Sequence, residues 1–506
     1  MSYSQRQSTS IDEALNLCRP LVWSIASSDC SGHAGSQADL KTFSQLDCHG
    51  STLICATTAQ NSLGLLSVNP VSEQAFTDQL QALADDTLPS AIKIGLLPTR
   101  FQLHTVIDFL QRHSDIPVIL DPVLGSSTGG ELTQLTADAL LSLLPVTTLF
   151  TPNLVETEAL LGYTLTQDSD IQEAAMQFHG LGAQGVLIKG GHGEGEVCKD
   201  WLSIQEPDGT LTQAWLIQPK LAASHLRGTG CTLSSAVAAF VAQGERLRDA
   251  VTLANAYVHA GILQGYQAGQ GPGPIGHGRA PTQFEHFPSV VDQLGRLTDT
   301  AFADCGHTPL GLYPVVDSVE WLRKLLPLGI TTAQLRIKDC PAEQLEQHLK
   351  DAIALGREYQ CRLFINDYWQ LAIKLGAYGV HLGQEDIDTA DLEAIKQAGL
   401  RLGISTHGDF EWARAASLKP SYLAIGAVFP TDTKTVHIVG LDALQRWVSI
   451  LKPHYPLTAI GGINLARLSG VLDTGIDSVA VVSAITAADD YKDAVNQFQK
   501  ALKKEV

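Results

Sequence analysis

Short apolar runs rich in β-branched residues alternate with amphipathic helical patterns through the second half of the chain. The runs are LYPVV (312–316), TAQLR (332–336), RLFIN (362–366), YGVHL (378–382), RLGIS (401–405), YLAIG (422–426), LTAIG (457–461) and SVAVV (478–482). Each is too short for a buried helix, whereas 341–359, 441–451 and 491–503 place apolar residues three and four positions apart. Strands that alternate with helices pair in parallel. The pattern therefore predicts a (β/α)8 barrel with its active site at the carboxyl ends of the strands.

Polar residues and glycines follow nearly every one of these strands. The set consists of cations, carboxylates and small phosphate-binding residues: Arg336, Lys338, Lys434, Asp367, Asp386, Gly462 and Ser483. A single such aspartate is more often a helix N-cap, and a single loop lysine is usually a solvated charge. Together at strand ends, the cations would neutralise a diphosphate, the carboxylates would hold Mg²⁺, and the residues after the last two strands would bind a phosphate. The predicted barrel mouth therefore indicates a site for two phosphorylated groups.

Seven further motifs lie in order between residues 310 and 485: QLRIKD (334–339), FINDYW (364–369), GVHLGQED (379–386), STH (405–407), FPTDTK (429–434), AIGGI (459–463) and VVSAI (481–485). Through these motifs, residues 310–485 resemble thiamine phosphate synthase. The resemblance implies the coupling of hydroxymethylpyrimidine diphosphate to thiazole phosphate, which gives thiamine phosphate and diphosphate. The segment 435–440 is shorter than the resemblance leads us to expect, which predicts an altered lid.

The resemblance also implies residue roles in the barrel. Asp367 and Asp386 would bind Mg²⁺, and Ser405 would lie beside the leaving group. The residues implied to bind substrates are Gln334, Arg336, Lys338, Asn366, Thr431, Thr433, Lys434, Gly462, Val482 and Ser483. Within that set, Arg336, Lys338, Asn366 and Lys434 would bind the diphosphate, and Gly462 and Ser483 the thiazole phosphate.

The first half of the chain also alternates strands and helices. Buried strands are predicted at 21–26, 91–95, 117–120, 148–151 and 185–190, with helical patterns between most of them. This pattern favours an open, doubly wound sheet whose ligands lie beyond the carboxyl ends of its strands. No GxxxxGK[ST] loop occurs, which disfavours a P-loop nucleotide fold.

A glycine loop leads directly into a helix of small residues in RGTGCTLSSAVAAF (227–240). Free backbone donors at such a helix start form an anion site. Gly228, Thr229 and Gly230 would hold the charge on a transferring phosphoryl group, and Cys231 would face the attacking hydroxyl. By itself a GTG sequence is more often a tight turn, with the cysteine a small buried residue.

A series of motifs runs through the first half of the chain: SGHAGSQADLKTF (31–43), TTAQNSLG (57–64), IKIGLLPT (92–99), LDPVLGSSTG (120–129), TPNLVETEALLG (151–162), IKGGHG (188–193) and the GTGC segment. Through these motifs, residues 20–285 resemble hydroxymethylpyrimidine and hydroxymethylpyrimidine phosphate kinases of the ribokinase-like group. The resemblance implies ATP-dependent phosphorylation of hydroxymethylpyrimidine and then of its phosphate, which would supply the barrel with its diphosphate substrate. The resemblance implies that Asp39 and Gln60 bind the pyrimidine. Asp121 and Asn153 would help to place the nucleotide phosphates and Mg²⁺. Lys189 would contact the nucleotide, and Cys231 would be the catalytic base.

Several positions depart from the kinase pattern. Ser27 stands where a glycine is usual, Ser127 stands where a lysine is usual, and Cys30, Ser31, His33 and Ser36 interrupt a run normally richer in glycine. A lost charged contact in a desolvated site costs about 1–3 kcal/mol. A side chain in place of a glycine with positive φ would also strain the loop. We therefore expect the first kinase step to be weak or absent.

Alternatives to this reading remain open from the sequence. The first domain would be a noncatalytic or single-step pyrimidine-binding module if its departures abolish catalysis. It would be a vitamin B6 kinase if the acceptor is a pyridine, although Gln60 suits an aminopyrimidine better. His33, His192 and His407 are candidates for acid–base roles, but a loop histidine is more often structural.

Composition and charge narrow the class of protein. The chain has 506 residues, 44% of them hydrophobic and 17% charged, with no apolar run near the length of a membrane helix and no apolar signal core at MSYSQRQSTS. A net charge of −19 without a basic run argues against nucleic acid as a partner. Nine cysteines without framework spacing indicate reduced thiols and a cytoplasmic protein.

We expect four segments in the chain: an N-terminal extension (1–19), a kinase domain (20–285), a linker (286–308) and the barrel (309–506). The resemblance implies a homo-oligomer that uses small-molecule substrates, ATP and Mg²⁺.

Overall fold

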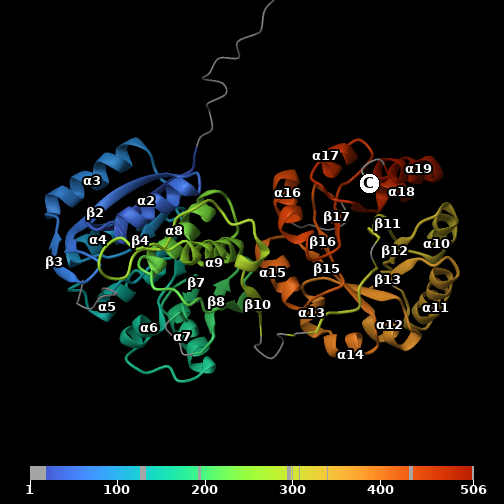
Figure 1. The fold of residues 1–506 in the computed structure, drawn as a ribbon, viewed down its shortest axis with the longest axis horizontal. Helices are drawn as coiled ribbons and strands as arrows, with labels where there is room; N and C mark the ends of the chain where they lie inside the picture. Colours follow the sequence, from blue (N-terminus) through green and yellow to red (C-terminus); the bar gives the residue numbers. More distant parts are fainter. Residues whose placement is uncertain are drawn as a thin grey trace, which may run out of the picture. The chain divides into compact units, whose positions relative to one another are not determined.

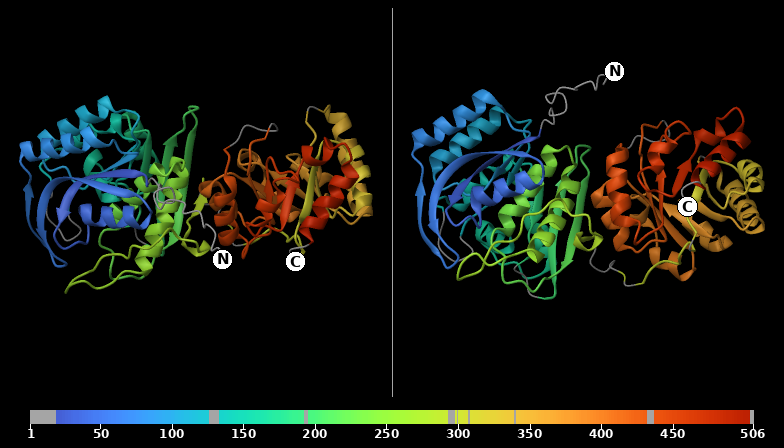
Figure 2. Two further views of the ribbon diagram at one scale, coloured as in Figure 1. Left: turned by 90° about the horizontal axis from the view of Figure 1, so that it is seen from above. Right: turned by 45° about the horizontal axis from the view of Figure 1, so that its top comes forward.

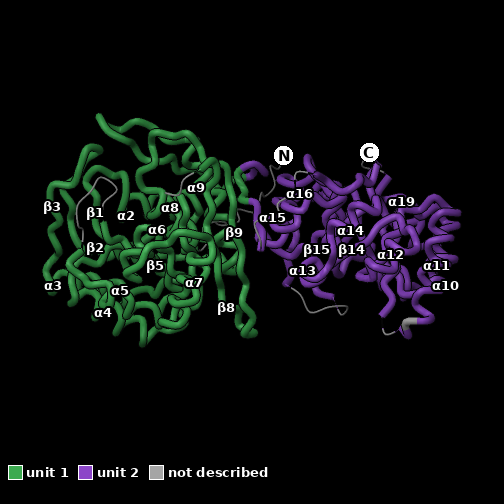
Figure 3. The backbone as a smooth tube through the Cα atoms, turned by 90° about the horizontal axis from the view of Figure 1, so that it is seen from below, with its two compact units in different colours: residues 1–281, 286–288 green, residues 282–285, 289–506 purple. Residues whose placement is uncertain are grey.

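The chain forms two compact units in a computed structural model. The model describes residues 19–125, 133–191, 195–292, 298, 300–306, 308–338, 340–431 and 437–503. One unit comprises residues 1–281 and 286–288, and the other comprises residues 282–285 and 289–506 (Figure 3). Each unit has its own sheet and its own hydrophobic core, so each is described by itself.

The first unit is built around an open, mixed sheet (Figure 1). Its strands are β1 (Leu21–Asp29), β2 (His49–Gln60), β3 (Leu65–Pro70), β4 (Ala91–Ile94), β5 (Val118–Leu120), β6 (Leu149–Phe150), β7 (Gly185–Ile188), β8 (Val197–Gln205) and β9 (Leu211–Pro219). Their order within the unit is β9-β8-β7-β6-β5-β4-β1-β2-β3. Strands β7, β6, β5, β4, β1 and β2 are parallel, whereas β3, β8 and β9 pair antiparallel at the two sides.

Helices of the first unit connect these strands. They are α2 (Gly35–Gln45), α3 (Glu73–Asp86), α4 (Arg100–Arg112), α5 (Ala137–Leu141), the 3₁₀ turn η1 (Leu144–Val146), α6 (Leu154–Leu161), α7 (Asp168–Gly180), α8 (Thr229–Ala242) and α9 (Leu247–Leu263). Helix α8 contacts α2, α9 and the central strands β1, β4 and β5. Nine of its residues are buried, most of them small, which lets the helix lie close to the sheet and brings its N-terminus to the strand ends.

The second unit is a closed barrel of eight parallel strands (Figure 2). These are β11 (Gly311–Val316), β12 (Thr332–Leu335), β13 (Arg362–Asn366), β14 (Gly379–Leu382), β15 (Arg401–Thr406), β16 (Tyr422–Ile425), β17 (Leu457–Ile460) and β18 (Ser478–Val481). The barrel closes where β11 pairs with β18, with Gly311 opposite Ser478. Each predicted barrel strand is present within two residues of its predicted bounds, and the predicted fold class of both halves is confirmed.

Helices and short segments complete the second unit. The helices are α10 (Val319–Leu325), the 3₁₀ turn η4 (Leu326–Leu328), α11 (Ala342–Glu358), α12 (Trp369–Leu375), α13 (Asp386–Thr389), α14 (Leu392–Gln397), α15 (Asp409–Ser417), α16 (Gly440–Leu451), α17 (Leu468–Leu472), α18 (Ser483–Thr486) and α19 (Tyr491–Leu502). Ahead of the barrel lie β10 (Ser289–Val291) and the first two residues of the 3₁₀ turn η2 (Phe284–His286), whose last residue belongs to the first unit. The Val290 amide of β10 donates to Ser417 Oγ of α15 over 2.9 Å. In the described part of the chain, no helix combines the length and the apolar character needed to cross a membrane.

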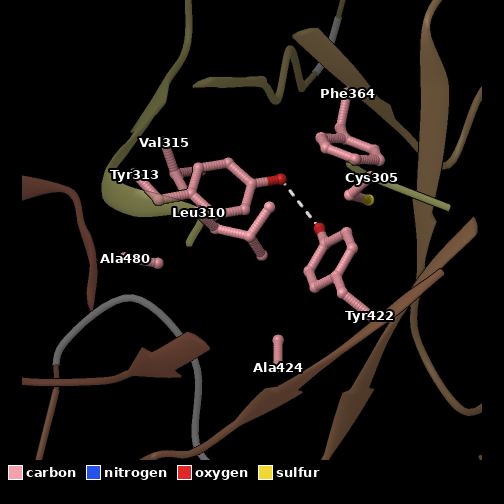
Figure 4. Close-up of a cluster of buried hydrophobic side chains, with 8 residues drawn as sticks. All are labelled: Cys305, Leu310, Tyr313, Val315, Phe364, Tyr422, Ala424 and Ala480. Carbon is pink, nitrogen blue, oxygen red and sulfur yellow. Dashed lines mark hydrogen bonds between the residues drawn. The ribbon is translucent and has the colours of Figure 1, made fainter. Parts of the chain in front are cut away.

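The inside of the barrel is filled by side chains (Figure 4). Tyr313 and Val315 lie two positions apart on β11, and Tyr422 and Ala424 lie two positions apart on β16, so each pair faces the same side of its strand. Around them pack Cys305, Leu310, Phe364 and Ala480. Figure 4 shows the hydroxyls of Tyr313 and Tyr422 pointing toward one another within this apolar cluster.

Candidate active sites

The barrel mouth collects the predicted strand-end residues of the second unit. Asn366 ends β13, with Asp367 directly after it, and Asp386 begins α13 shortly after β14. Arg336 follows β12, and Ser405 lies in the last part of β15. Because all eight strands are parallel, these residues lie at one end of the barrel.

Asp367 and Asp386 form a pair of interacting carboxyl groups. Burial, and after it the charge of Asp386, raises the pKa of Asp367 to about 6. Asp367 has a φ of +63°, an unusual conformation for a residue with a side chain, and its amide donates to the His381 carbonyl over 3.1 Å. Asp386 Oδ2 accepts a 3.0 Å bond from the Gly383 amide. The preceding turn thus holds Asp386, and the two carboxyl groups offer the hard oxygen ligands that suit Mg²⁺.

Two cations of the mouth are not neutralised by nearby carboxylates. Neither Arg336, which is half-buried, nor Lys338, which is exposed, forms an ion pair with any residue that the structure describes. The longer-range charge of Arg336 acts on Asp367, where it opposes the rise in pKa. Cations without a protein counterion suit a polyanionic ligand.

The turn after β17 brings backbone close to backbone. Gly461 and Gly462 have φ of +101° and +62°, and a Cβ on Gly462 would lie 2.5 Å from the Pro430 carbonyl oxygen. Ser483 is exposed at the start of α18, directly after Val482. Glycines after strand seven and a short helix after strand eight are the usual phosphate position of such barrels.

A chain of polar groups runs through the barrel beneath the mouth. The Tyr313 and Tyr422 hydroxyls are 2.7 Å apart, His381 Nδ1 is 2.7 Å from the Tyr422 hydroxyl, and His381 Nε2 is 2.8 Å from Ser405 Oγ. Burial, and after it the charges of Arg336 and His407, lowers the pKa of His381 to about 3. Sequence reasoning missed His381 because it lies inside a strand between apolar residues, where a histidine is usually read as part of the core.

Other predicted residues of the barrel are placed differently. Gln334 is 5% exposed near the end of β12, and its contact with a substrate stays a prediction. His407 Nδ1 lies 2.7 Å from Glu411 Oε2 on α15, which gives the imidazole a structural partner. Thr431 is half-buried at the end of the loop after β16, whereas Thr433, Lys434 and the start of the predicted lid lie outside the described residues.

The first unit brings the glycine loop next to a buried ion pair. Gly228, with φ of +81°, is the N-cap of α8, and a Cβ there would lie 2.2 Å from the His33 carbonyl oxygen. Lys189 Nζ donates to Asp121 Oδ1 over 2.7 Å. A Cβ on Gly230 would lie 3.4 Å from that Lys189 nitrogen. The start of α8 thus lies beside the pair of Lys189 and Asp121, and its backbone donors together with the lysine suit an anion.

Cys231 follows this glycine loop in the first turn of α8. Burial raises the pKa of the Cys231 thiol to about 11, although the charge of Lys93 acts in the opposite direction. A general base must lose its proton before it can accept one, so the isolated thiol is a weak base at neutral pH. Its role as base stays a prediction.

Asn153 and Glu156 close a capping box at the start of α6. The Asn153 side chain accepts from the Glu156 amide over 2.8 Å, and the Glu156 carboxylate accepts from the Asn153 amide over 2.7 Å. Burial raises the pKa of Glu156 to about 7, even though Lys189 opposes the shift. Glu156 therefore joins the charged cluster of Asp121 and Lys189. The N-x-x-E spacing could have revealed it in the sequence.

Gln60 and Asp39, the two predicted pyrimidine contacts, have different surroundings. Gln60 Oε1 accepts a 3.2 Å bond from Arg227, and Gln60 Nε2 donates to Thr58 Oγ1 over 3.1 Å, which fixes the orientation of its amide. Asp39 is fully buried and accepts bonds from Ser24, Lys93 and Ser235. A ligand would reach this carboxylate only by displacing those donors, and the contact of Asp39 with the pyrimidine stays a prediction.

The prediction that side chains in place of glycines strain the backbone of the kinase loop is wrong. Gly32 and Gly35 take the positive φ values of +71° and +60°, whereas Ser27, Cys30, Ser31, His33 and Ser36 have none. Ser27 lies in β1 with its hydroxyl buried and without a hydrogen-bond partner in the described part of the chain. The cost at Ser27 is therefore desolvation rather than backbone strain. Ser127 and His192 lie outside the described residues.

The two folds and their sites define a bifunctional transferase, with a ribokinase-like kinase followed by a barrel synthase. Family models for phosphomethylpyrimidine kinase and thiamine monophosphate synthase match residues 29–276 and 312–485, respectively. The thiamine-phosphate synthase of Serratia proteamaculans (strain 568) is 60% identical over 206 residues, which are 40% of this chain and 96% of that protein. The chain therefore belongs, through its two halves, to the phosphomethylpyrimidine kinase and thiamine-phosphate synthase families.

Two of the similar solved structures are kinases. A phosphomethylpyrimidine kinase from Clostridium difficile 630 is 32% identical, and the match covers 47% of this chain and 98% of that one, with a TM-score of 0.42. A pyridoxal kinase from Staphylococcus aureus, solved with AMP-PCP and pyridoxal, is also 32% identical, and the match covers 54% of this chain and 99% of that one, with a TM-score of 0.48.

Proposed function

We propose that the chain makes thiamine phosphate in consecutive reactions. The first unit phosphorylates hydroxymethylpyrimidine and its phosphate with ATP, and the barrel couples the resulting diphosphate to thiazole phosphate. The observation that carries the barrel half is the meeting of unpaired cations with the Asp367–Asp386 pair at one mouth. The kinase half rests on the family match and on the glycine loop beside Lys189.

In the barrel, the C–O bond between the pyrimidine methylene and the diphosphate breaks, and the electron pair leaves with the diphosphate. Arg336 and Lys338 bind the departing anion, which lowers the barrier electrostatically. Asp367 and Asp386 would hold Mg²⁺, which supplies further positive charge to the diphosphate oxygens. The thiazole nitrogen, held through its phosphate at Gly462 and Ser483, then forms the new C–N bond. This step relies on proximity rather than on a protein nucleophile.

In the kinase, the acceptor hydroxyl attacks the terminal phosphoryl group of ATP. Backbone donors of Gly228 to Gly230 face the transferring group, and Lys189 neutralises charge beside it. Cys231 is the candidate to take the hydroxyl proton, provided that bound substrate and nucleotide lower the pKa of its thiol. Asp121 and Asn153 would help to place the nucleotide phosphates and Mg²⁺.

The test follows each half on the purified chain. ATP consumption is measured with hydroxymethylpyrimidine, its phosphate and pyridoxal as separate acceptors, and thiamine phosphate is measured from supplied pyrimidine diphosphate and thiazole phosphate. We expect turnover with hydroxymethylpyrimidine phosphate and Mg²⁺-dependent formation of thiamine phosphate. Turnover with pyridoxal alone would assign the first unit to vitamin B6, and inactivity with all three acceptors would make it a noncatalytic module.

A further inference from the structure

We infer that His381 is a positioning residue that holds Ser405 with its hydroxyl proton directed at the leaving diphosphate. The inference rests on the proposed synthase function of the barrel. It assigns His381, Tyr422 and Tyr313 to the reaction, although none of them lies among the strand-end residues of the mouth.

The first step of the argument is the continuity of the hydrogen-bonded chain. Tyr313, Tyr422, His381 and Ser405 come from four different strands, and each neighbouring pair is within 2.7 or 2.8 Å. Tyr313 and Tyr422 lie inside the apolar cluster of Figure 4, where solvent does not compete for their hydroxyls. Ser405 is half-buried at the upper end of the chain. The chain therefore runs from the dry interior to the mouth.

Donor and acceptor counting gives this chain one direction. The Tyr313 hydroxyl has one hydrogen-bond partner in the described part of the chain, the Tyr422 hydroxyl. Among the described contacts, the Tyr313 proton then has a single acceptor, the Tyr422 oxygen. Tyr422 in turn donates to Nδ1 of His381. A neutral imidazole that accepts at Nδ1 carries its proton on Nε2.

The consequence for Ser405 follows directly. His381 Nε2 donates to Ser405 Oγ, so the serine hydroxyl is an acceptor on that side and its own proton points elsewhere. The Ser405 carbonyl accepts a 2.8 Å bond from Gln384 Nε2, which fixes the backbone. Because the hydroxyl oxygen and the backbone of Ser405 are both held in place, the free hydroxyl proton is available to an anion at the mouth. In the opposite direction, Ser405 would donate inward, and the Tyr313 proton would have no acceptor in the described interior.

The packing around Tyr422 leaves room for its hydroxyl to reach His381. Gly403 of β15 lies opposite Tyr422 of β16, and a Cβ on Gly403 would lie 2.1 Å from the tyrosine ring and 2.4 Å from its hydroxyl oxygen. Only a glycine therefore lets the tyrosine hydroxyl reach His381. The His381 and Tyr422 rings are also stacked, with centroids 5.7 Å apart.

The first test is made on the unmodified full-length protein. Nitrogen NMR of ¹⁵N-histidine-labelled protein reports which ring nitrogen of His381 carries the proton, and the resonance is assigned by its loss in whichever of H381N and H381Q folds. We expect the Nε2–H tautomer. If the wild-type protein forms thiamine phosphate but His381 carries its proton on Nδ1, the inference is wrong and the proposed function stands. If the wild type does not form thiamine phosphate, the proposed function itself is wrong.

The second test uses two uncharged replacements of similar size. In H381Q the amide nitrogen reaches the place of Nε2 and keeps a donor to Ser405, whereas in H381N the shorter amide reaches only the place of Nδ1. We expect kcat of H381N to fall on the order of 10- to 100-fold with little change in the KM for the diphosphate, and H381Q to recover most of the rate. We also expect the double variant S405A/H381N to be no slower than S405A. Equal losses in H381N and H381Q, or additive losses in the double variant, would contradict the inference.

Discussion

Asp367 and Asp386 approach each other closely enough at the barrel mouth for the charge of Asp386 to raise the pKa of Asp367, in addition to the larger effect of burial. Two carboxylates that repel each other gain from a shared cation. Asp367 also retains a left-handed backbone conformation, with φ of +63°. Such conformations cost about 1–3 kcal/mol and concentrate at functional sites.

Removal of one carboxylate tests the metal assignment. We predict that D386A loses Mg²⁺-dependent formation of thiamine phosphate from supplied diphosphate, because one aspartate alone binds the ion weakly. The control is E393A, which removes an exposed carboxylate from α14 of the same barrel and should keep full activity. Unchanged turnover of D386A at limiting Mg²⁺ would refute the assignment.

Cys231 should react with alkylating agents only at high pH. Its thiol has a pKa raised to about 11 by burial, so in the free protein the reactive thiolate forms as the pH rises toward that value. We predict that the alkylation rate rises about tenfold per pH unit between roughly pH 8 and pH 10. Mass spectrometry of the modified peptide measures this rate, and C231S identifies the site. A rate that levels off near neutral pH would instead show an activated thiolate in the free enzyme.

The buried pair of Asp39 and Lys93 should be essential to the stability of the first unit. Burial alone lowers the pKa of Lys93, but Asp39 beside it raises the pKa above its usual value, so the lysine stays charged although neither side chain of the pair is exposed to solvent. We predict that K93M lowers the free energy of unfolding by about 3–5 kcal/mol, because it leaves a buried carboxylate without its counterion. The matched control R323A breaks the exposed pair with Glu320 and should cost about 0–1 kcal/mol. Denaturant unfolding compares the two, and similar losses would contradict the prediction.

Gly462 should tolerate no side chain, unlike a glycine of similar backbone conformation elsewhere in the barrel. A Cβ at Gly462 would lie 2.5 Å from the Pro430 oxygen, whereas Gly399 has φ of +71° with nothing within 4 Å of a Cβ. We predict that G462A raises the KM for thiazole phosphate at least about tenfold by displacing the turn, while G399A costs only about 1 kcal/mol of stability. Steady-state kinetics of both variants measures the difference. Equal KM values would remove Gly462 from the phosphate site.

The sequence predicted the barrel better than the open sheet. Every barrel strand is a short, largely apolar run between helices, which is the signature of a parallel strand buried on both faces. Strands β8 and β9 were missed because each is buried only in its second half. Strand β3 was missed because it is mostly exposed, with Leu66 81% exposed. Such antiparallel strands depend on their partners more than on a local pattern.

The sequence predicted those site residues that come directly after a strand. Strand-end residues such as Asp367 and Asp386 could be found because parallel topology brings strand ends together. The partnership of Asp39 with Lys93, and that of His381 with Ser405, joins side chains from separate elements. Since no local spacing encodes such contacts, the sequence predicted neither partnership.

The pairing of β11 with β18 also sets an order of events during synthesis of the chain. The first barrel strand can find its last neighbour only after about 160 further residues have been made. The first unit, in contrast, has all of its own strands by Pro219 and its glycine-loop helix by Ala242. The kinase can therefore fold on the ribosome while the barrel is still an incomplete sheet with two open edges, and the nascent synthase remains the aggregation-prone partner until its last strand emerges.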